Sequence, residues 1–361
     1  MMQKEFNSVK SFTGYFRNKR FKNIIFIFGH KSFFSTGASK DFDIFLKDNN
    51  CFLLEKKKEK IIYEDLIEQF NKYKEKDIDC IISIGGGSAI DLGKFLKFFL
   101  AYKRIIFETE ERYKKKIFHV VIPTTAGSGS ERTRFAVAYR NNIKISLDNK
   151  LILPDAVVFN KKYLMVAPEY VKACSVFDGL SQAVESIWAV RATKLSRKYA
   201  FEAIKLYKKN MFRFLISKEL LYAGKVQQAA SLAGKAINIT RTTGPHALSY
   251  FLTADLGIPH GHAVALLLKE FLEFNYTYGD KKTKKNILEI ILCFSVKDIQ
   301  SLCDLWISFM KKAGLKTRIK DILNVELDFK KALSRVNLER LGNNPVSLGK
   351  KDIKKIYLNI W

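Results

Sequence analysis

Short apolar runs that alternate with an amphipathic stretch restrict the fold of the first half of the chain more than any other feature. The amphipathic stretch, residues 63–76, carries Leu66, Ile67, Phe70 and Tyr73 at helical spacing. The apolar runs read as buried strands and cover residues 23–28, 51–54, 80–84 and 117–122. Because strand–helix–strand units build parallel sheets, we predict an α/β fold with a parallel sheet and helices on both faces.

The pattern changes from about Pro168 onward, where few strand signals appear. Long stretches with helical periodicity take their place at residues 196–214, 220–239 and 287–294. We therefore predict two domains, an α/β domain over residues 1–165 and an all-helical domain over residues 166–361.

The composition describes a globular protein with a basic surface. Hydrophobic residues make up 47% of the chain, and the formal net charge is +27, with lysines dispersed along the whole length. Such a charge can mark a nucleic-acid partner, but dispersed lysines favour a solvated surface that attracts anionic substrates. No apolar run approaches the roughly 18 residues that span a bilayer, and no secretory signal is expected at the N-terminus. Five widely spaced cysteines without a CxxC pair favour a reducing cytoplasm.

Two polar loops follow predicted strands and suit a nucleotide. In the first, residues 85–94 (GGGSAIDLGK), a glycine turn opens a helix, so exposed N–H groups and the helix dipole can hold a phosphate. The second, residues 123–131 (PTTAGSGSE), adds hydroxyl groups at the end of a strand, where open α/β sheets bind ligands. The alternative for the first loop alone is a tight turn without a ligand. The predicted cofactor contacts are Gly85, Gly86, Gly87, Ser88, Asp91, Thr124, Thr125 and Ser128.

For a nicotinamide dinucleotide bound at these loops, the residues after the first predicted strand would bear on the choice between NADPH and NADH. An acidic side chain there would pair with the ribose 2′-hydroxyl and repel a 2′-phosphate. The chain reads Phe28-Gly29-His30-Lys31-Ser32, with no acid. We therefore favour NADPH, with Lys31 near the 2′-phosphate, and keep NADH as the alternative.

Metal-binding side chains gather in the helical half. Asp178 and Gln182 are four residues apart, so a helix presents both on one face. Three of the five histidines follow at His246, His260 and His262. A carboxylate, an amide oxygen and the imidazoles of His246 and His260 can hold a divalent metal and leave a position open for a substrate oxygen. A lone histidine is more often a packing residue, but this grouping favours a metal site.

Four motifs occur in the order GGGSAIDLGK, PTTAGSGSE, DGLSQAVES and HALSY with PHGHA. In this order they resemble the iron-containing (group III) alcohol dehydrogenase family. The resemblance implies a Rossmann-like nucleotide-binding domain, a helical metal-binding and substrate domain, and NADPH or NADH as cofactor, with Lys144 near it. It also implies iron(II), with zinc(II) as the alternative, in the cleft between the domains. Gln182 stands where most members have histidine, and Tyr250 where many have histidine.

Residues 236–250, with PHGHAVAL after them, resemble the phosphonoacetaldehyde reductase branch of that family. This narrower match implies reduction of phosphonoacetaldehyde to 2-hydroxyethylphosphonate. A phosphonate dianion needs cationic partners, and Arg241 and Arg132 are the predicted ones. Tyr250 and His262 are the candidate proton donors, and the sequence does not choose between them.

Several other functions are compatible with the sequence. The nearest is a general short-chain alcohol or aldehyde dehydrogenase of the same family without a phosphonate preference. A zinc-dependent protein like glycerol-phosphate dehydrogenase fits the loops less well, and a basic nucleic-acid-binding protein lacks a reader motif. Gln182 and Tyr250 also leave room for a member that binds cofactor without turnover. No membrane partner is expected, and a homodimer is left open.

Overall fold

The computed structural model describes residues 3–17, 19, 21–107, 113–141 and 143–361. The chain forms two compact units, Met1–Ala167 and Pro168–Trp361, which are described separately. Among the described residues, no helix is both long and apolar enough to cross a bilayer.

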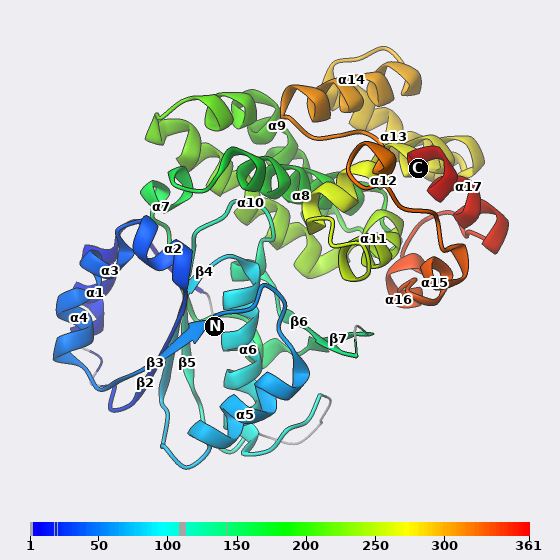
Figure 1. Ribbon diagram of the computed structural model, residues 1–361. Coiled ribbons are helices and arrows are strands. Elements are labelled where there is room, and N and C mark those ends of the chain that lie inside the picture. The colour runs from blue at the N-terminus through cyan, green and yellow to red at the C-terminus, as the bar shows by residue number, and fades with distance from the viewer. Residues whose placement is uncertain (1–2, 18, 20, 108–112, 142) are drawn as a thin grey trace. The chain divides into compact units, whose positions relative to one another are not determined.

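The first unit contains a six-stranded sheet in which every neighbouring pair of strands is parallel (Figure 1). Its order from edge to edge is β1 (Lys4–Phe6), β8 (Ala156–Val158), β5 (Phe118–Pro123), β4 (Cys80–Gly85), β2 (Ile24–Gly29) and β3 (Cys51–Lys56). The four predicted strands are confirmed as β2, β3, β4 and β5. The sequence analysis missed β1 and β8, because three-residue strands carry too little periodicity to recognise.

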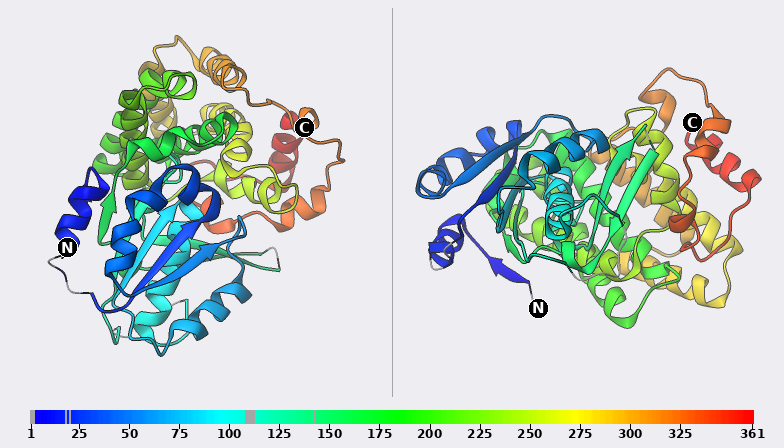
Figure 2. Two further views of the ribbon diagram at one scale, coloured as in Figure 1. Left: turned by 60° about the vertical axis from the view of Figure 1, so that its left-hand side comes forward. Right: turned by 90° about the horizontal axis from the view of Figure 1, so that it is seen from below.

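Helices cover both faces of this sheet, which explains why its central strands are apolar without alternation. On β2, Phe26 and Phe28 pack in the core beneath the N-terminal helices, whereas Ile25 and Ile27 pack in a second core on the other face. The first group comprises α1 (Val9–Arg17), α2 (His30–Ser35), α3 (Ala38–Asp41) and α4 (Asp43–Asp48). The second comprises α5 (Tyr63–Tyr73) and α6 (Gly87–Tyr102), and the two groups flank the sheet in Figures 1 and 2.

An antiparallel hairpin after β5 was not predicted. It consists of β6 (Phe135–Arg140) and β7 (Ile143–Asp148), between the short 3-10 helices η1 (Ser130–Arg132) and η2 (Lys150–Ile152). Ala136 and Ala138 alternate inward along β6 and join the core next to α6. The unit ends with α7 (Lys161–Met165).

The second unit is helical, as predicted. Its longer helices are α8 (Glu169–Trp188), α9 (Lys194–Ile216), α10 (Leu220–Thr240), α11 (Gly244–Ala254), α12 (His260–Tyr278), α13 (Lys281–Phe294), α14 (Ile299–Lys312) and α17 (Lys350–Ile360). Short turns of helix lie between them at η3 (Ile319–Asp321), α15 (Phe329–Ser334) and α16 (Leu338–Leu341). The predicted helices at 196–214, 220–239 and 287–294 correspond to α9, α10 and α13.

Helix α8 is the centre of the second unit, packed against α9, α10 and α12. Every residue from Val176 to Trp188 is buried, including Asp178, Gln182 and Glu185. Buried polar groups are costly unless they are paired, so their concentration on one central helix marks a functional position.

Gly261 permits the close approach of α12 to α8. A Cβ atom at Gly261 would lie 1.9 Å from the carbonyl oxygen of Cys174, so a side chain there must push the two helices apart. We expect Gly261→Ala to destabilise the protein by about 1–3 kcal/mol, the usual cost of overpacking, seen as a lower melting temperature by circular dichroism. Gly14→Ala is the control, since a Cβ there meets nothing within 4 Å on helix α1. An unchanged melting temperature for Gly261→Ala would contradict this packing.

Candidate functional site

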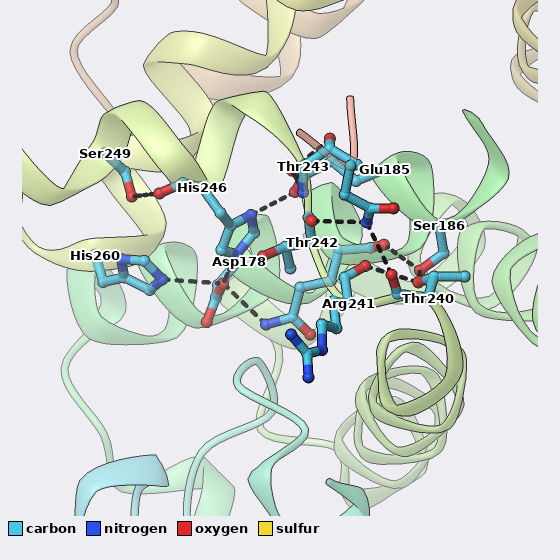
Figure 3. Close-up of polar contacts among 12 residues, drawn as sticks. Asp178, Glu185, Ser186, Thr240, Arg241, Thr242, Thr243, His246, Ser249 and His260 are labelled. Atoms are coloured by element: carbon cyan, nitrogen blue, oxygen red, sulfur yellow. Dashed lines mark hydrogen bonds and ion pairs between the residues drawn. The ribbon is translucent and has the colours of Figure 1, made fainter. Parts of the chain in front are cut away.

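Three side chains from three helices of the second unit converge on one point (Figure 3). Asp178 lies on α8, His246 in the first turn of α11, and His260 at the start of α12. The Asp178 Oδ1 atom is 3.3 Å from His246 Nε2 and 4.0 Å from His260 Nε2. One ligand atom from each residue lies within 4.8 Å of the others, a spacing that a single metal ion can bridge.

The charges of this cluster are those of a cation site. Burial alone would raise the pKa of Asp178, but the hydrogen bond from His246 and the nearby imidazoles hold it below its usual value. Burial would likewise lower the pKa of His246, but Glu185 and Asp178 outweigh it and raise that pKa to about 9. One carboxylate and two imidazoles suit iron(II) or zinc(II). The amide of Gln182 and the carboxylate of Glu185 adjoin them. The residues present therefore fit a divalent metal.

Gln182 lies one helical turn after Asp178 and contacts it. Its Nε2 atom donates a hydrogen bond to Asp178 Oδ1 at 3.0 Å, and the residue is buried. Rotation about the last side-chain bond exchanges the amide nitrogen and oxygen, so Gln182 can present its oxygen at the same position. Coordination by Gln182 stays a prediction, as does coordination by the other three residues.

Glu185 has a part in this site that the sequence analysis did not assign. Its fully buried carboxylate contacts His246 Nδ1 and accepts hydrogen bonds from the backbone N–H and the hydroxyl of Thr243, both at 2.9 Å. A carboxylate on one imidazole nitrogen fixes the ring so that the other nitrogen, Nε2, faces the metal position. The signal was the seven-residue spacing from Asp178, which places Glu185 on the same face of α8.

The turn between α10 and α11 holds Arg241 in a strained conformation. Its backbone has φ 60° and ψ −177°, a region that is essentially restricted to glycine and costs about 1–3 kcal/mol for other residues. The Thr240 hydroxyl donates to the Arg241 carbonyl at 2.7 Å, and Asn343 Nδ2 donates to the carbonyls of Thr240 and Thr242 at 2.8 and 3.0 Å. The Arg241 guanidinium is paired with Glu339 of α16.

The two candidate proton donors differ in their surroundings. His262 Nε2 lies 2.7 Å from the carbonyl oxygen of Lys316, and Nδ1 lies 2.9 Å from the Tyr170 hydroxyl. Both ring nitrogens therefore have protein partners away from Asp178, and burial lowers the pKa of His262. Tyr250 is buried on α11, the helix that carries His246. These positions favour Tyr250, and the choice stays a prediction.

The two loops that are predicted to bind a nucleotide lie against each other in the first unit. Thr124 N–H donates to the Gly85 carbonyl at 3.0 Å, and a Cβ atom at Gly87 would lie 2.7 Å from Ser128 Oγ. Gly85 has φ 151°, which favours glycine, and a Cβ there would lie 2.7 Å from Ala89 Cβ. Only glycine leaves enough room at positions 85 and 87 for this close packing.

The loops also occupy the position in the sheet where open α/β folds bind ligands. The chain adds β3 on one side of β2 and then β4 on the other, so the sheet order reverses between β2 and β4. Gly86 and Thr125 meet at this edge, since a Cβ on Gly86 would lie 3.5 Å from the Thr125 side chain. Ser88 lies in the first turn of α6, whose N–H groups can face a phosphate.

Asp91 joins these loops to the hairpin. Its carboxylate accepts hydrogen bonds from the Ser130 hydroxyl and, at 3.1 Å, from the Val137 backbone N–H. The fully buried Lys94 donates to Ser130 and Thr133 at 2.8 and 3.0 Å, and burial lowers its pKa to about 8. These contacts tie Asp91 to the second loop and to the hairpin, and its role in cofactor binding stays a prediction.

The remaining predicted contacts of the first unit are dispersed. Arg132 is buried and forms an ion pair with Glu5 at 2.8 Å, so its guanidinium holds the N-terminal strand. Lys144 lies on β7, and the exposed Lys31 is the second residue of α2, the helix after β2. Arg132 as a substrate ligand has no support from these contacts.

Glu55 weakens the basis for the predicted NADPH preference. It lies near the end of β3, and its carboxylate is 3.2 Å from His30 Nδ1, directly after β2. Residues 28–32 contain no acid, but an acidic side chain nevertheless lies next to the end of β2. The neighbouring strand provides one, which sequence proximity could not reveal.

A parallel sheet with two glycine- and hydroxyl-rich loops at its strand ends, together with a helical unit that carries a carboxylate–imidazole cluster, is the arrangement expected of a metal-dependent, nucleotide-binding enzyme. Residues 4–161 match the family description "Iron-containing alcohol dehydrogenase", and residues 172–361 match "Fe-containing alcohol dehydrogenase family, C-terminal". The chain belongs to the iron-containing alcohol dehydrogenase family, and it is an NAD(P)-dependent oxidoreductase of aldehydes and alcohols.

Individual relatives differ in the substrates that their names state. An NADPH-dependent butanol dehydrogenase of Clostridium saccharobutylicum is 27% identical over 295 residues, 77% of this chain and 76% of that protein. A phosphonoacetaldehyde reductase of Streptomyces viridochromogenes is 32% identical over 160 residues, 44% of this chain and 40% of that protein. The crystal structure of sulfoacetaldehyde reductase from Bifidobacterium kashiwanohense in complex with NAD+ has a TM-score of 0.87 at 21% identity, over 99% of this chain and 96% of that chain. At this identity the structural match shows the fold alone.

Removal of the Glu185 charge should weaken metal binding. We expect Glu185→Gln to lower iron(II) or zinc(II) affinity by about 10- to 100-fold, as is typical when the partner of a ligating histidine is lost. Titration of the metal-stripped protein with a chelator-buffered ion measures this. Glu202→Gln, an exposed residue on α9, is the control. Equal affinities for the two variants would exclude a positioning role for Glu185.

Glu55 should influence cofactor choice. We expect Glu55→Gln to raise the ratio of kcat/KM for NADPH to that for NADH by about two- to fivefold, the range for one partly exposed charge. Steady-state kinetics with both cofactors measure the ratio, and Glu68→Gln, exposed on α5, serves for comparison. A ratio that does not change, or that falls, would place the ribose elsewhere.

Proposed function

We propose that the protein reduces a small anionic aldehyde to its alcohol, and that phosphonoacetaldehyde, giving 2-hydroxyethylphosphonate, is the substrate. The observation that carries this proposal is Arg241, an arginine in a glycine-type conformation. Strained residues persist where the surrounding structure enforces them, and they are concentrated at functional sites.

The surroundings of Arg241 support an anion-binding role. Thr240 Oγ1 lies 3.1 Å from Ser186 Oγ, and that hydroxyl donates to the carbonyl of Gln182. Arg241 therefore directly follows Thr240, whose hydroxyl contacts Ser186 on α8, one helical turn after Gln182. A guanidinium forms two parallel hydrogen bonds with a phosphonate or sulfonate, which would orient the aldehyde at the far end of such a substrate.

We further propose roles for the other residues of the chain. Asp178, Gln182, His246 and His260 would hold the metal, and Glu185 would fix the ring of His246. Gly85, Gly86, Gly87, Ser88, Thr124, Thr125 and Ser128 would bind the cofactor in a domain of residues 1–165, with Asp91 supporting them and with Lys31 and Lys144 close to it. Tyr250 would donate the final proton, with His262 as the alternative. When bound, the metal polarises the aldehyde oxygen and the nicotinamide supplies the hydride.

The names of two similar proteins agree with an anionic substrate, since one is a phosphonoacetaldehyde reductase and the other a sulfoacetaldehyde reductase. The five free cysteines suit a reducing cytoplasm as the location. A second candidate function is reduction of uncharged short-chain aldehydes. The butanol dehydrogenase favours it, since that match covers more of the chain than the match to the phosphonoacetaldehyde reductase does.

Replacement of Arg241 tests the proposal and separates function from folding. We expect Arg241→Ala and Arg241→Gly to raise KM for phosphonoacetaldehyde by roughly 10- to 100-fold, the value of lost charge-assisted hydrogen bonds. The KM for butanal should change far less. The Gly variant relieves the backbone strain, so its melting temperature should be no lower than that of the Ala variant. Steady-state kinetics on both aldehydes and thermal unfolding provide these values. Equal losses on both aldehydes would refute phosphonate binding by Arg241.

A further inference from the structure

A segment from the C-terminal part of the second unit lies over the turn that carries Arg241. At one end, the Asn337 N–H donates to the Ala247 carbonyl at 3.3 Å. At the other, Asn343 Nδ2 donates to the carbonyls of Thr240 and Thr242. Residues 337–343 are therefore fixed at both ends to the segment that carries Arg241 and His246.

Helix α16, between these two ends, directs one acidic side chain to the turn. Glu339 forms an ion pair with Arg241, and its Oε1 atom is also 4.0 Å from Nη1 of Arg191. The neighbouring Arg340 is buried, whereas the Leu338 side chain is exposed. Glu339 is thus a carboxylate held between two guanidinium groups.

The ion pair between Arg241 and Glu339 is partly exposed to solvent. The Glu339 side chain is 46% exposed and that of Arg241 is 20% exposed, so solvent and salt screen their attraction. A phosphonate or sulfonate offers three oxygens and up to two negative charges to the same guanidinium. Such a group can replace a screened carboxylate, and it would then lie close to Glu339 unless that side chain moves aside.

We propose that Glu339 is an internal counter-ion that occupies Arg241 in the absence of substrate and sets the charge selectivity of the site. An anionic aldehyde displaces the carboxylate from Arg241, with Arg191 as a second cation. An uncharged aldehyde leaves the Arg241–Glu339 pair intact and meets a neutralised site. The substrate class follows from the proposed function, on which this inference rests.

The test removes the charge of Glu339 and keeps its shape. In Glu339→Gln, we expect the affinity for methylphosphonate, measured by calorimetry on the metal-loaded full-length protein, to increase about two- to fivefold at low salt. The ratio of kcat/KM for phosphonoacetaldehyde to that for butanal should rise by a similar factor. Both gains should decrease at high salt, because screening already weakens the original pair.

Two further variants make the result specific. Glu326→Gln removes the same charge from an exposed position in the same unit and should leave both quantities unchanged. In an Arg241→Gly background, Glu339→Gln should have a much smaller effect, since only the more distant Arg191 then remains as a cation for the anion.

The outcomes separate this inference from the proposed function. Suppose that Arg241→Gly abolishes the preference for phosphonoacetaldehyde, but that Glu339→Gln has no larger effect than Glu326→Gln. The counter-ion role of Glu339 is then wrong, and the proposed substrate class stands. If the unmodified protein neither binds methylphosphonate nor prefers phosphonoacetaldehyde to butanal, the proposed substrate is wrong, and the counter-ion role falls with it.

Discussion

The second unit depends on a buried chain of charges that runs from Glu185 through His246 to Asp178. Isolated charges in the centre of a helical bundle would be strongly unfavourable, but each of these has charged or hydrogen-bonding neighbours that stabilise it. The hydrogen bonds from Thr243 complete the environment of Glu185. This network explains how one central helix can carry the buried carboxylates of Asp178 and Glu185, and how α11 is directed to them.

Much of the fold could be predicted because it rests on local patterns. The apolar runs of the first half had no alternation, which is the pattern of strands covered on both faces, and the cores beside Phe26 and Ile25 bear this out. The spacing of Asp178 and Gln182 placed both on one face of α8. The grouping of Asp178, His246 and His260 came from motifs, and their ligand atoms converge.

What the sequence could not provide are partners distant along the chain. Glu55 meets His30 because β3 is the neighbour of β2, and Glu339 meets Arg241 because residues 337–343 fold back over the turn. Neither ion pair is indicated by the spacing of its two residues along the chain. Arg132 shows the converse, since its place after a polar loop suggested a substrate contact, whereas Glu5 occupies its guanidinium. Charge alone predicts that a partner exists, and only the fold decides which one.

The backbone of Arg241 has a consequence for how such sequences diverge. A glycine at this turn would fold with less strain, so selection for folding alone opposes the arginine. The arginine is therefore kept only if its side chain has a functional benefit that outweighs the backbone strain. A descendant lineage that changed to neutral substrates would be free to lose the side chain, and glycine would be the most accessible replacement. Under the proposed function, the identity of this single residue would therefore record the charge of the substrate.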